Sequence, residues 1–146
     1  MVKKTVVSVF FGCCVGILIA ESVIESPISV HASEQKRVEH VSSLAQLSIM
    51  LSSCKKVILK FSAVWCGPCR ASLPLFEELS GNNNYQNVTF VEIDVEKGGE
   101  IANRYVIRGI PAFVCLSGNK VVGKIVGFDQ STRGKLIRLL DDLVKA

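Results

Sequence analysis

The segment Val57–Ala63 (VILKFSA) constrains the fold more than any other part of this sequence. It is rich in β-branched and aromatic residues and almost wholly apolar, as expected for a strand that is covered on both faces. The following segment, Cys66–Leu79, repeats its apolar residues at helical spacing, and Pro74 is expected to kink this helix because proline lacks a backbone N–H. We therefore expect Val57–Ala63 at the centre of a sheet, with the chain passing directly into a helix.

The other predicted elements complete one sheet between helical layers. Ser43 and Gln46 fit a capping box at the start of a helix that ends at 54–56, and Gly118-Asn119 fits the turn of a hairpin. This order predicts an α/β fold with a central mixed sheet and helices on both faces. The remaining elements are a short edge strand at Arg37–Val41, strands at Val88–Val95, Ala112–Ser117 and Val121–Val126, a short helix at Glu100–Tyr105 and a final helix from Ser131 or Thr132.

The first 32 residues have the pattern of an export signal. Two lysines precede an uncharged, apolar run at 5–20, and small residues allow cleavage after Ser22 or after Ala32. As a helix, the run reaches about 24 Å at about 1.5 Å per residue, which is short of the roughly 30 Å of a bilayer core. We therefore expect a signal peptide in residues 1–32 and one domain in residues 33–146. The alternative is an uncleaved anchor through residues 5–20.

Charge and cysteine content narrow the functional classes. Lys and Arg number 17 against 13 Asp and Glu, and a formal charge of +4 is too small and too scattered to indicate a nucleic-acid partner. Outside the leader, cysteine stands at positions 54, 66, 69 and 115. In an exported protein these thiols meet an oxidising compartment, so disulfide chemistry is the default expectation.

The motif Trp65-Cys66-Gly67-Pro68-Cys69-Arg70 places two thiols three positions apart, where the buried strand passes into the helix. Cys66 falls at or beside the helix start, where free N–H groups and the positive end of the helix dipole favour the thiolate. Cys69, one turn further, is placed to attack a mixed disulfide formed by Cys66 and to release the reduced substrate. The pair is therefore expected to cycle between dithiol and disulfide.

Half of a zinc site is the main alternative for a C-x-x-C pair. The other candidate ligands, Cys54, Cys115 and His40, are scattered singly and supply no second pair, so no metal is expected. A purely structural disulfide across so short a loop adds little stability. Pairing between Cys54 and Cys115 stays open, although a separate buried thiol is the favoured state of Cys115.

Together with features further along the chain, the motif resembles the thioredoxin family, over roughly residues 36–146. The resemblance implies the thioredoxin fold, with Cys66 as the exposed attacking cysteine, Cys69 as the resolving one and Pro111 as a cis proline that faces the pair. It also implies that the cysteine pair itself carries the electrons, so no cofactor is expected. The further features are Pro74 five residues after Cys69, Ile110-Pro111 after Arg108-Gly109, and Gly127 after the hairpin.

The same resemblance implies that substrates bind on a shallow apolar surface around the pair. A proline has no N–H and can turn the chain so that Ile110 presents its backbone to a substrate strand. Ile93 and Val126, taken singly, fit an ordinary core equally well. The surface is expected to consist of Trp65, Gly67, Pro68, Ile93, Ile110, Pro111, Val126 and Gly127.

The chain departs from the family pattern at Lys60. Thioredoxins typically have a buried Asp six residues before the attacking cysteine, which serves proton transfer, and a basic residue that accompanies it; this chain has Lys60 and Phe90 instead. One expectation is that the Lys60 stem packs while its amine reaches water. If the amine instead stays charged beneath Cys69, it stabilises the thiolates and makes the protein more oxidising; if it is neutral, it can accept the proton itself.

These observations predict an exported, monomeric thiol–disulfide oxidoreductase that reduces protein disulfides in the periplasm or another extracytoplasmic space. Its expected partners are disulfide-containing client proteins and an upstream electron donor, such as a membrane thiol carrier. The absence of a histidine between the cysteines favours the reducing direction, because such a histidine stabilises the thiolate in oxidants and isomerases. The alternatives are an oxidase or isomerase on the same scaffold, and a non-catalytic module that binds a partner through the surface around Pro111.

Overall fold

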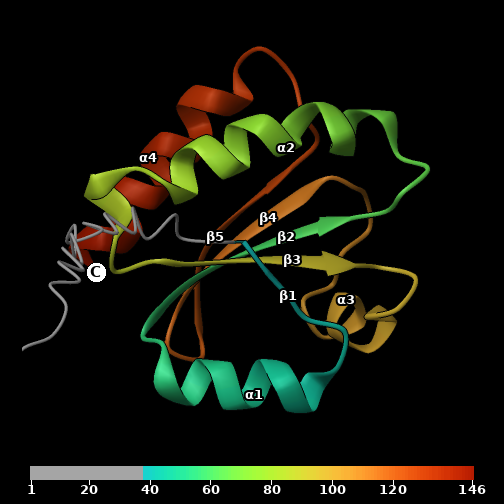
Figure 1. Ribbon diagram of the computed structural model, residues 1–146, viewed down its shortest axis with the longest axis horizontal. Helices are drawn as coiled ribbons and strands as arrows, with labels where there is room; N and C mark the ends of the chain where they lie inside the picture. The colour runs from blue at the N-terminus through green and yellow to red at the C-terminus, as the bar shows by residue number, and fades with distance from the viewer. Residues whose placement is uncertain (1–37) are drawn as a thin grey trace, which may run out of the picture. The chain divides into compact units, whose positions relative to one another are not determined.

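Residues 38–146 are described by a computed structural model (Figure 1). The predicted signal peptide, its cleavage sites and the domain boundary after residue 32 lie outside the described residues. Within residues 38–146, no helix combines the length and the apolar character needed to span a membrane.

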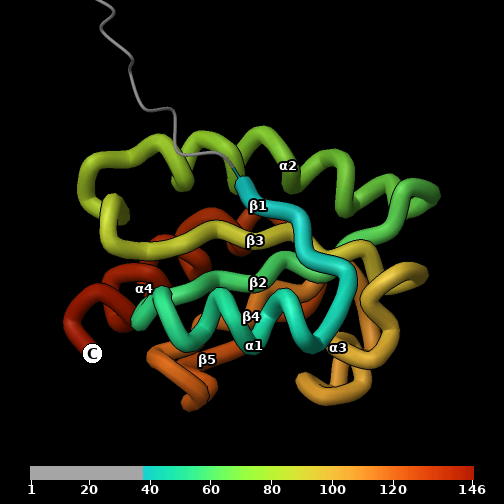
Figure 2. Tube along the Cα trace, turned by 60° about the horizontal axis from the view of Figure 1, so that its bottom comes forward, coloured from blue at the N-terminus to red at the C-terminus, as the bar shows by residue number. Residues whose placement is uncertain are grey.

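Five strands of the described region form one mixed sheet, as the sequence predicts. They are β1 (Glu39–His40), β2 (Lys56–Ser62), β3 (Thr89–Asp94), β4 (Ala112–Ser117) and β5 (Lys120–Val126). The order across the sheet is β1-β3-β2-β4-β5; β1, β3 and β2 are parallel, whereas β4 is antiparallel to β2 and β5 is antiparallel to β4 (Figure 2). The central place of β2 confirms the prediction from its apolar sequence.

Helices cover both faces of this sheet, which confirms the predicted layers. One face carries α1 (Leu44–Ser53) and α3 (Gly99–Arg104), and the other carries α2 (Gly67–Ser80) and α4 (Thr132–Lys145) (Figure 1). Because α2 follows β2 directly, its N-terminus lies at the carboxyl end of the central strand.

Alternate residues of β2 enter two separate cores, because side chains alternate between the faces of a strand. Leu59 and Phe61 pack with residues of α1 and α3, whereas Ile58 packs with residues of α2 and α4. Lys60 follows Ile58 by two positions, so its side chain projects toward the α2 face. A charged residue therefore enters the layer between the sheet and α2.

Local side-chain bonds explain where α1 begins. The Ser43 hydroxyl accepts a hydrogen bond from the Gln46 backbone N–H at 3.3 Å, as the capping pattern predicts. The Gln46 side chain returns the bond one residue earlier than expected, because its Oε1 accepts from the backbone N–H of Ser42 at 3.1 Å. Two N–H groups at the helix start are thus satisfied.

The segment after α2 forms a short 3₁₀ turn, Asn83–Tyr85. The Asn82 side chain accepts a hydrogen bond from the Asn84 backbone N–H at 2.9 Å, which is the local bond that stabilises such turns. Tyr85 is buried, and its hydroxyl donates to Asp141 of α4 at 2.9 Å. Through this hydrogen bond, the turn that follows α2 contacts the C-terminal helix α4.

Candidate active site

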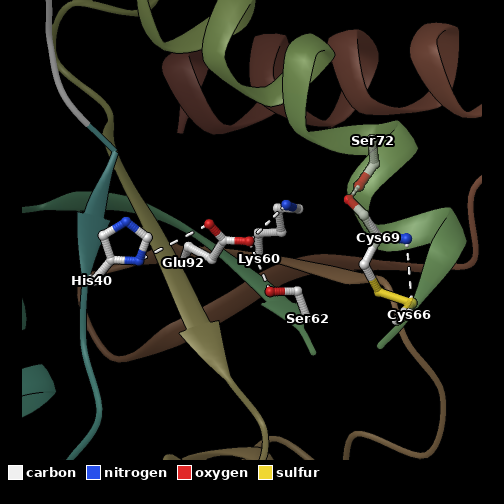
Figure 3. Close-up of polar contacts among 7 residues, drawn as sticks. All are labelled: His40, Lys60, Ser62, Cys66, Cys69, Ser72 and Glu92. Atoms are coloured by element: carbon white, nitrogen blue, oxygen red, sulfur yellow. Dashed lines mark hydrogen bonds and ion pairs between the residues drawn. A yellow bond between two sulfur atoms is a disulfide. The ribbon is translucent and has the colours of Figure 1, made fainter. Parts of the chain in front are cut away.

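Cys66 and Cys69 are joined by a disulfide with an S–S distance of 2.06 Å (Figure 3). Cys66 is the N-cap of α2, and its Sγ accepts a hydrogen bond from the Cys69 backbone N–H at 3.2 Å. When the bond is reduced, this N–H and the positive end of the helix dipole favour a thiolate on Cys66. Cys69 lies inside the first turn of the helix, one turn from its partner.

The two sulfur residues differ little in exposure in the disulfide form. Cys66 is 5% exposed and Cys69 2%, so Cys66 is less open than the family resemblance implies. Its chain neighbours on both sides, Trp65 and Gly67, are exposed. A partner is therefore able to reach the loop around Cys66, whereas Cys69 faces inward.

Most of the predicted surface residues lie where a partner is able to meet them, whereas Ile93 and Pro111 are buried. Trp65, Gly67, Pro68 and Val126 are exposed, and Gly127 is half-buried with a φ of +89°, a value that favours glycine. Ile93 contradicts the prediction, because its side chain is fully buried in the core beneath α1 and α3. Its side chain points from β3 to the face of the sheet that α1 and α3 cover, which explains this placement.

The Ile110–Pro111 segment borders the disulfide. Its peptide bond is cis, and Ile110 packs against the small cluster of Ala63, Cys66 and Cys69. Pro111 itself is buried, and its carbonyl accepts a hydrogen bond from the Gly127 N–H at 2.8 Å. This bond ties two of the predicted surface segments to each other.

Two polar contacts that the sequence did not predict hold the Trp65 loop. The Trp65 indole N–H donates to Glu96 Oε1 at 3.0 Å, while the Glu96 backbone N–H donates to Asp94 at 2.9 Å. On the other side, the Arg70 guanidinium donates to the Val64 carbonyl at 2.8 Å. The loop before Cys66 is thus fixed both from the loop that follows β3 and from α2.

Lys60 is buried, and its amine does not reach water. The side chain is 1% exposed, and Nζ lies 2.7 Å from Oε1 of Glu92 on the neighbouring strand β3. The same oxygen accepts a hydrogen bond from the Ser62 hydroxyl at 2.7 Å (Figure 3). The expectation that the Lys60 amine is hydrated is therefore wrong, because β3 supplies a carboxylate opposite it.

Glu92 is a further functional candidate, which no local sequence pattern indicates. Burial alone raises the pKa of Glu92, but the hydrogen bonds from Lys60 and Ser62, with the Lys60 charge, outweigh burial and lower that pKa below its ordinary value. Glu92 is therefore ionised at neutral pH. The only sequence signal is a charged residue inside an apolar strand, and the register that pairs it with Lys60 appears only in the folded sheet.

A cleft of about 590 Å³ connects this ion pair with the resolving cysteine. Cys69, Lys60, Ser62 and Glu92 all line it, so the resolving cysteine and the ion pair face the same cavity. Within the described residues, no group of three or more His, Cys, Asp or Glu side chains is arranged to hold a metal ion. The other lining residues are His40, Val41, Ser42, Ala63, Val64, Arg70, Leu73, Asp94 and Lys97.

Cys54 and Cys115 remain free thiols and do not pair. Cys54 packs against the core beneath α1, whereas Cys115 belongs to the core beneath α2 and α4, on the opposite face of the sheet. Burial raises the pKa of the Cys115 thiol to about 12. The second disulfide that the sequence left open is thus excluded by the sheet between the two cysteines.

Comparison with known proteins agrees with this geometry. The model of the family described as Thioredoxin matches residues 38–142. A thioredoxin of Mycoplasmoides gallisepticum is 38% identical over 91 residues, which cover 62% of this chain and 89% of that protein. The rice protein Thioredoxin H5 is 41% identical over 91 residues, covering 56% and 66% of the two chains.

Solved structures give the same result for the fold. The crystal structure of Malassezia sympodialis thioredoxin superimposes with a TM-score of 0.68 at 30% identity, covering 75% of this chain and 92% of that one. Thioredoxin from Trypanosoma brucei brucei gives a TM-score of 0.68 at 26% identity, with coverages of 77% and 95%.

Proposed function

The chain belongs to the thioredoxin family and is a thiol–disulfide oxidoreductase, and from this premise we propose that it reduces protein disulfides outside the cytoplasm. The observation that carries the proposal is the Cys66–Cys69 pair at the start of α2, beside the exposed Trp65. Only Gly67 and Pro68 separate the cysteines, so no histidine adds positive charge between them.

The location is proposed from the sequence that precedes the domain. The apolar run at 5–20 and the small residues after it fit an export signal, and exported proteins meet disulfide-bonded clients. A reductase in such a compartment needs a supply of electrons. We assign this role to an upstream dithiol donor, such as a membrane thiol carrier.

The reductive cycle uses only the two cysteines. The Cys66 thiolate attacks a client disulfide, forms a mixed disulfide and expels one client thiolate, which takes a proton from solvent. Cys69 then loses its proton and attacks Cys66 Sγ, which closes the Cys66–Cys69 disulfide and releases the second client thiol. Two electrons pass to the client, and the upstream dithiol returns two electrons to the protein.

Substrate trapping tests both the reaction and its direction. The variant Cys69→Ala lacks the resolving thiol, so mixed disulfides with clients should accumulate on Cys66. The matched control, Cys66→Ala, should trap nothing. The captured clients could instead be proteins that normally gain disulfides in the same compartment. That result would favour the oxidase or isomerase and contradict the reducing direction.

The non-catalytic alternative makes a different prediction. If the protein is a module that uses only its apolar surface, the wild-type protein does not reduce insulin. The double variant Cys66→Ser/Cys69→Ser then still binds the partner. We expect the wild-type protein to reduce insulin and the double variant to be inactive. Wild-type protein without insulin reduction, together with unchanged partner binding by the double variant, would overturn the enzymatic proposal.

Export is tested on the full chain. Expression in a Gram-negative host, followed by fractionation and N-terminal sequencing, should recover protein outside the cytoplasm that begins after Ser22 or after Ala32. Recovery of membrane-bound protein with an intact leader would support the anchor. Cytoplasmic protein with residues 1–32 intact would contradict export.

A further inference from the structure

A buried ion pair lies beside the redox cysteines and takes no part in the exchange described above. Lys60 is 1% exposed and Glu92 16%, and the Nζ–Oε1 distance of 2.7 Å is that of a hydrogen-bonded pair. Burying two charges costs free energy that replacement by apolar residues often avoids. The pair lines the same cleft as Cys69. Its cost and its position therefore suggest that it acts on the chemistry of that cysteine.

The pair has a direction within the fold. Lys60 stands on the central strand β2, whereas Glu92 stands on β3 and lies nearer the β1 edge. The Lys60 ammonium is 5.8 Å from the ring centroid of Phe76, a residue of α2, the helix that carries Cys69. Figure 3 shows Lys60 between Glu92 and Cys69. The positive end of the pair thus faces the resolving cysteine, and the negative end faces the sheet edge.

Glu92 also has a partner on its outer side. The Nδ1 atom of His40, on β1, lies 4.0 Å from Glu92 Oε2, and the His40 side chain is 76% exposed. The carboxylate is therefore held between a buried ammonium and a solvent-exposed ring. This arrangement keeps the negative charge on the side of the pair away from Cys69.

The other charged groups of the cleft are more open to solvent than Lys60. Arg70 is exposed and directs its guanidinium to the Val64 carbonyl, and Lys97 is exposed at the rim. Asp94 is half-buried and accepts from the Glu96 N–H. Solvent screens exposed charges strongly. Lys60 is thus the charged group of the cleft with the least screening.

We propose that Lys60 and Glu92 form an oriented ion pair that makes the Cys69 thiol more acidic, with Lys60 facing the sulfur and Glu92 holding Lys60 charged. Both are positioning residues, since neither contacts the client. The proposal selects, among the possibilities that the sequence left open for Lys60, the charged amine beneath Cys69. It rests on the exchange reaction of the pair, in whichever direction the protein works.

The pair acts at the second step of the cycle. Cys69 gives its proton to water in the cleft, and the resulting thiolate attacks Cys66 Sγ; the bond between Cys66 and the client breaks, and the client sulfur leaves with the electron pair and takes a proton from solvent. The Lys60 ammonium neither gains nor loses a proton in this step. It stabilises the negative charge that appears on Cys69.

The test measures the acidity of Cys69 without any client, so it stands whether or not the reductase proposal holds. In a Cys66→Ser background, the pH at which iodoacetamide alkylates Cys69 at half its maximal rate is determined by peptide mass spectrometry. The background is combined with Lys60→Met, which keeps the apolar stem, and with Lys60→Met/Glu92→Gln, which removes both charges. Lys97→Met is the matched control, because it removes the same charge from the exposed rim. Cys54, on the other face of the sheet, serves as an internal control thiol.

Lys60→Met should raise the midpoint so that the Cys69 thiolate fraction at neutral pH falls about tenfold, the effect of one poorly screened charge. The double variant should lower the Cys69 thiolate fraction only about threefold. The carboxylate that it also removes opposes the effect of Lys60, but weakly, because it lies further from the sulfur. Lys97→Met should change the Cys69 thiolate fraction less than about twofold, and the Cys54 midpoint should not change.

The double variant decides the orientation and also guards against misfolding. Removing both partners leaves no unpaired buried charge, so this variant should fold even if Lys60→Met alone does not. An unchanged Cys69 midpoint in the double variant would overturn the proposal. So would a more acidic Cys69, because that result would place Glu92, not Lys60, nearer the sulfur.

Discussion

Two pairs of cysteines in the described region share one chemistry but lie in different environments. Cys66 and Cys69 stand at the N-terminus of α2, beside a cleft and a buried ion pair. Cys54 and Cys115 pack against apolar cores on opposite faces of the sheet. The difference shows that reactivity comes from the place of a thiol in the fold, because helix N–H groups and nearby charges favour the thiolate, whereas apolar burial opposes it.

The largest expected effect is on catalysis. Cys66→Ser should reduce the rate of insulin reduction to the uncatalysed background, because it removes the nucleophile. Cys115→Ala, the matched loss of a buried sulfur, should keep the wild-type rate and lower only the free energy of unfolding, by about 1 kcal/mol. An inactive but folded Cys115→Ala protein would erase the distinction between the two pairs.

A second effect concerns alkylation of the native, reduced protein. With a pKa of about 12, the Cys115 thiol is ionised at pH 7 in only about one molecule in 10⁵. Iodoacetamide should therefore modify Cys66 first and Cys115 only after denaturant is added, as followed by intact and peptide mass. Modification of Cys115 at a rate close to that of Cys66 in the folded protein would break the comparison.

Acid should lower the free energy of unfolding by removing the contribution of the Lys60–Glu92 pair beside the redox cysteines, whereas the apolar cores of the described region contain no such ion pair. The folded-state pKa of Glu92 lies below its ordinary value of 4.5, so its contribution to stability is complete above that value and is lost as the pH falls through the lower, folded-state pKa. In Lys60→Met/Glu92→Gln this part of the acid dependence should disappear. Urea unfolding across pH 7 to 3 measures it, and parallel curves for both proteins would show that the pair has no such role.

The smallest effect concerns backbone strain at Val106. Val106 has a φ of +51°, which β-branched residues rarely adopt, and its carbonyl accepts a hydrogen bond from the Lys124 amine at 2.7 Å. Val106→Gly should raise the free energy of unfolding by about 0.5–1 kcal/mol, since relief of strain exceeds the added flexibility of glycine. The matched control is Gly118→Ala, at a φ of +57°, which should lower it by a similar amount. Destabilisation by Val106→Gly would mean that the valine side chain makes stabilising contacts.

Local sequence patterns predicted the elements that carry the redox pair. The apolar run of β2 and the helical spacing after Cys66 depend on neighbouring residues, so both could be recognised without a structure. Family resemblance predicts a surface position for Ile93, yet its side chain points into the core that α1 and α3 cover. Glu92 cannot be recognised from local sequence for a related reason, because only the parallel pairing of β2 with β3 brings its carboxylate to Lys60.

A single-turnover reaction tests the central claim most directly. Reduced protein is mixed with insulin, quenched by acid, denatured, alkylated and mapped by mass spectrometry. We predict one Cys66–Cys69 disulfide for each insulin disulfide reduced, with Cys54 and Cys115 recovered as alkylated thiols. Loss of insulin disulfides without formation of the Cys66–Cys69 bond would contradict the account.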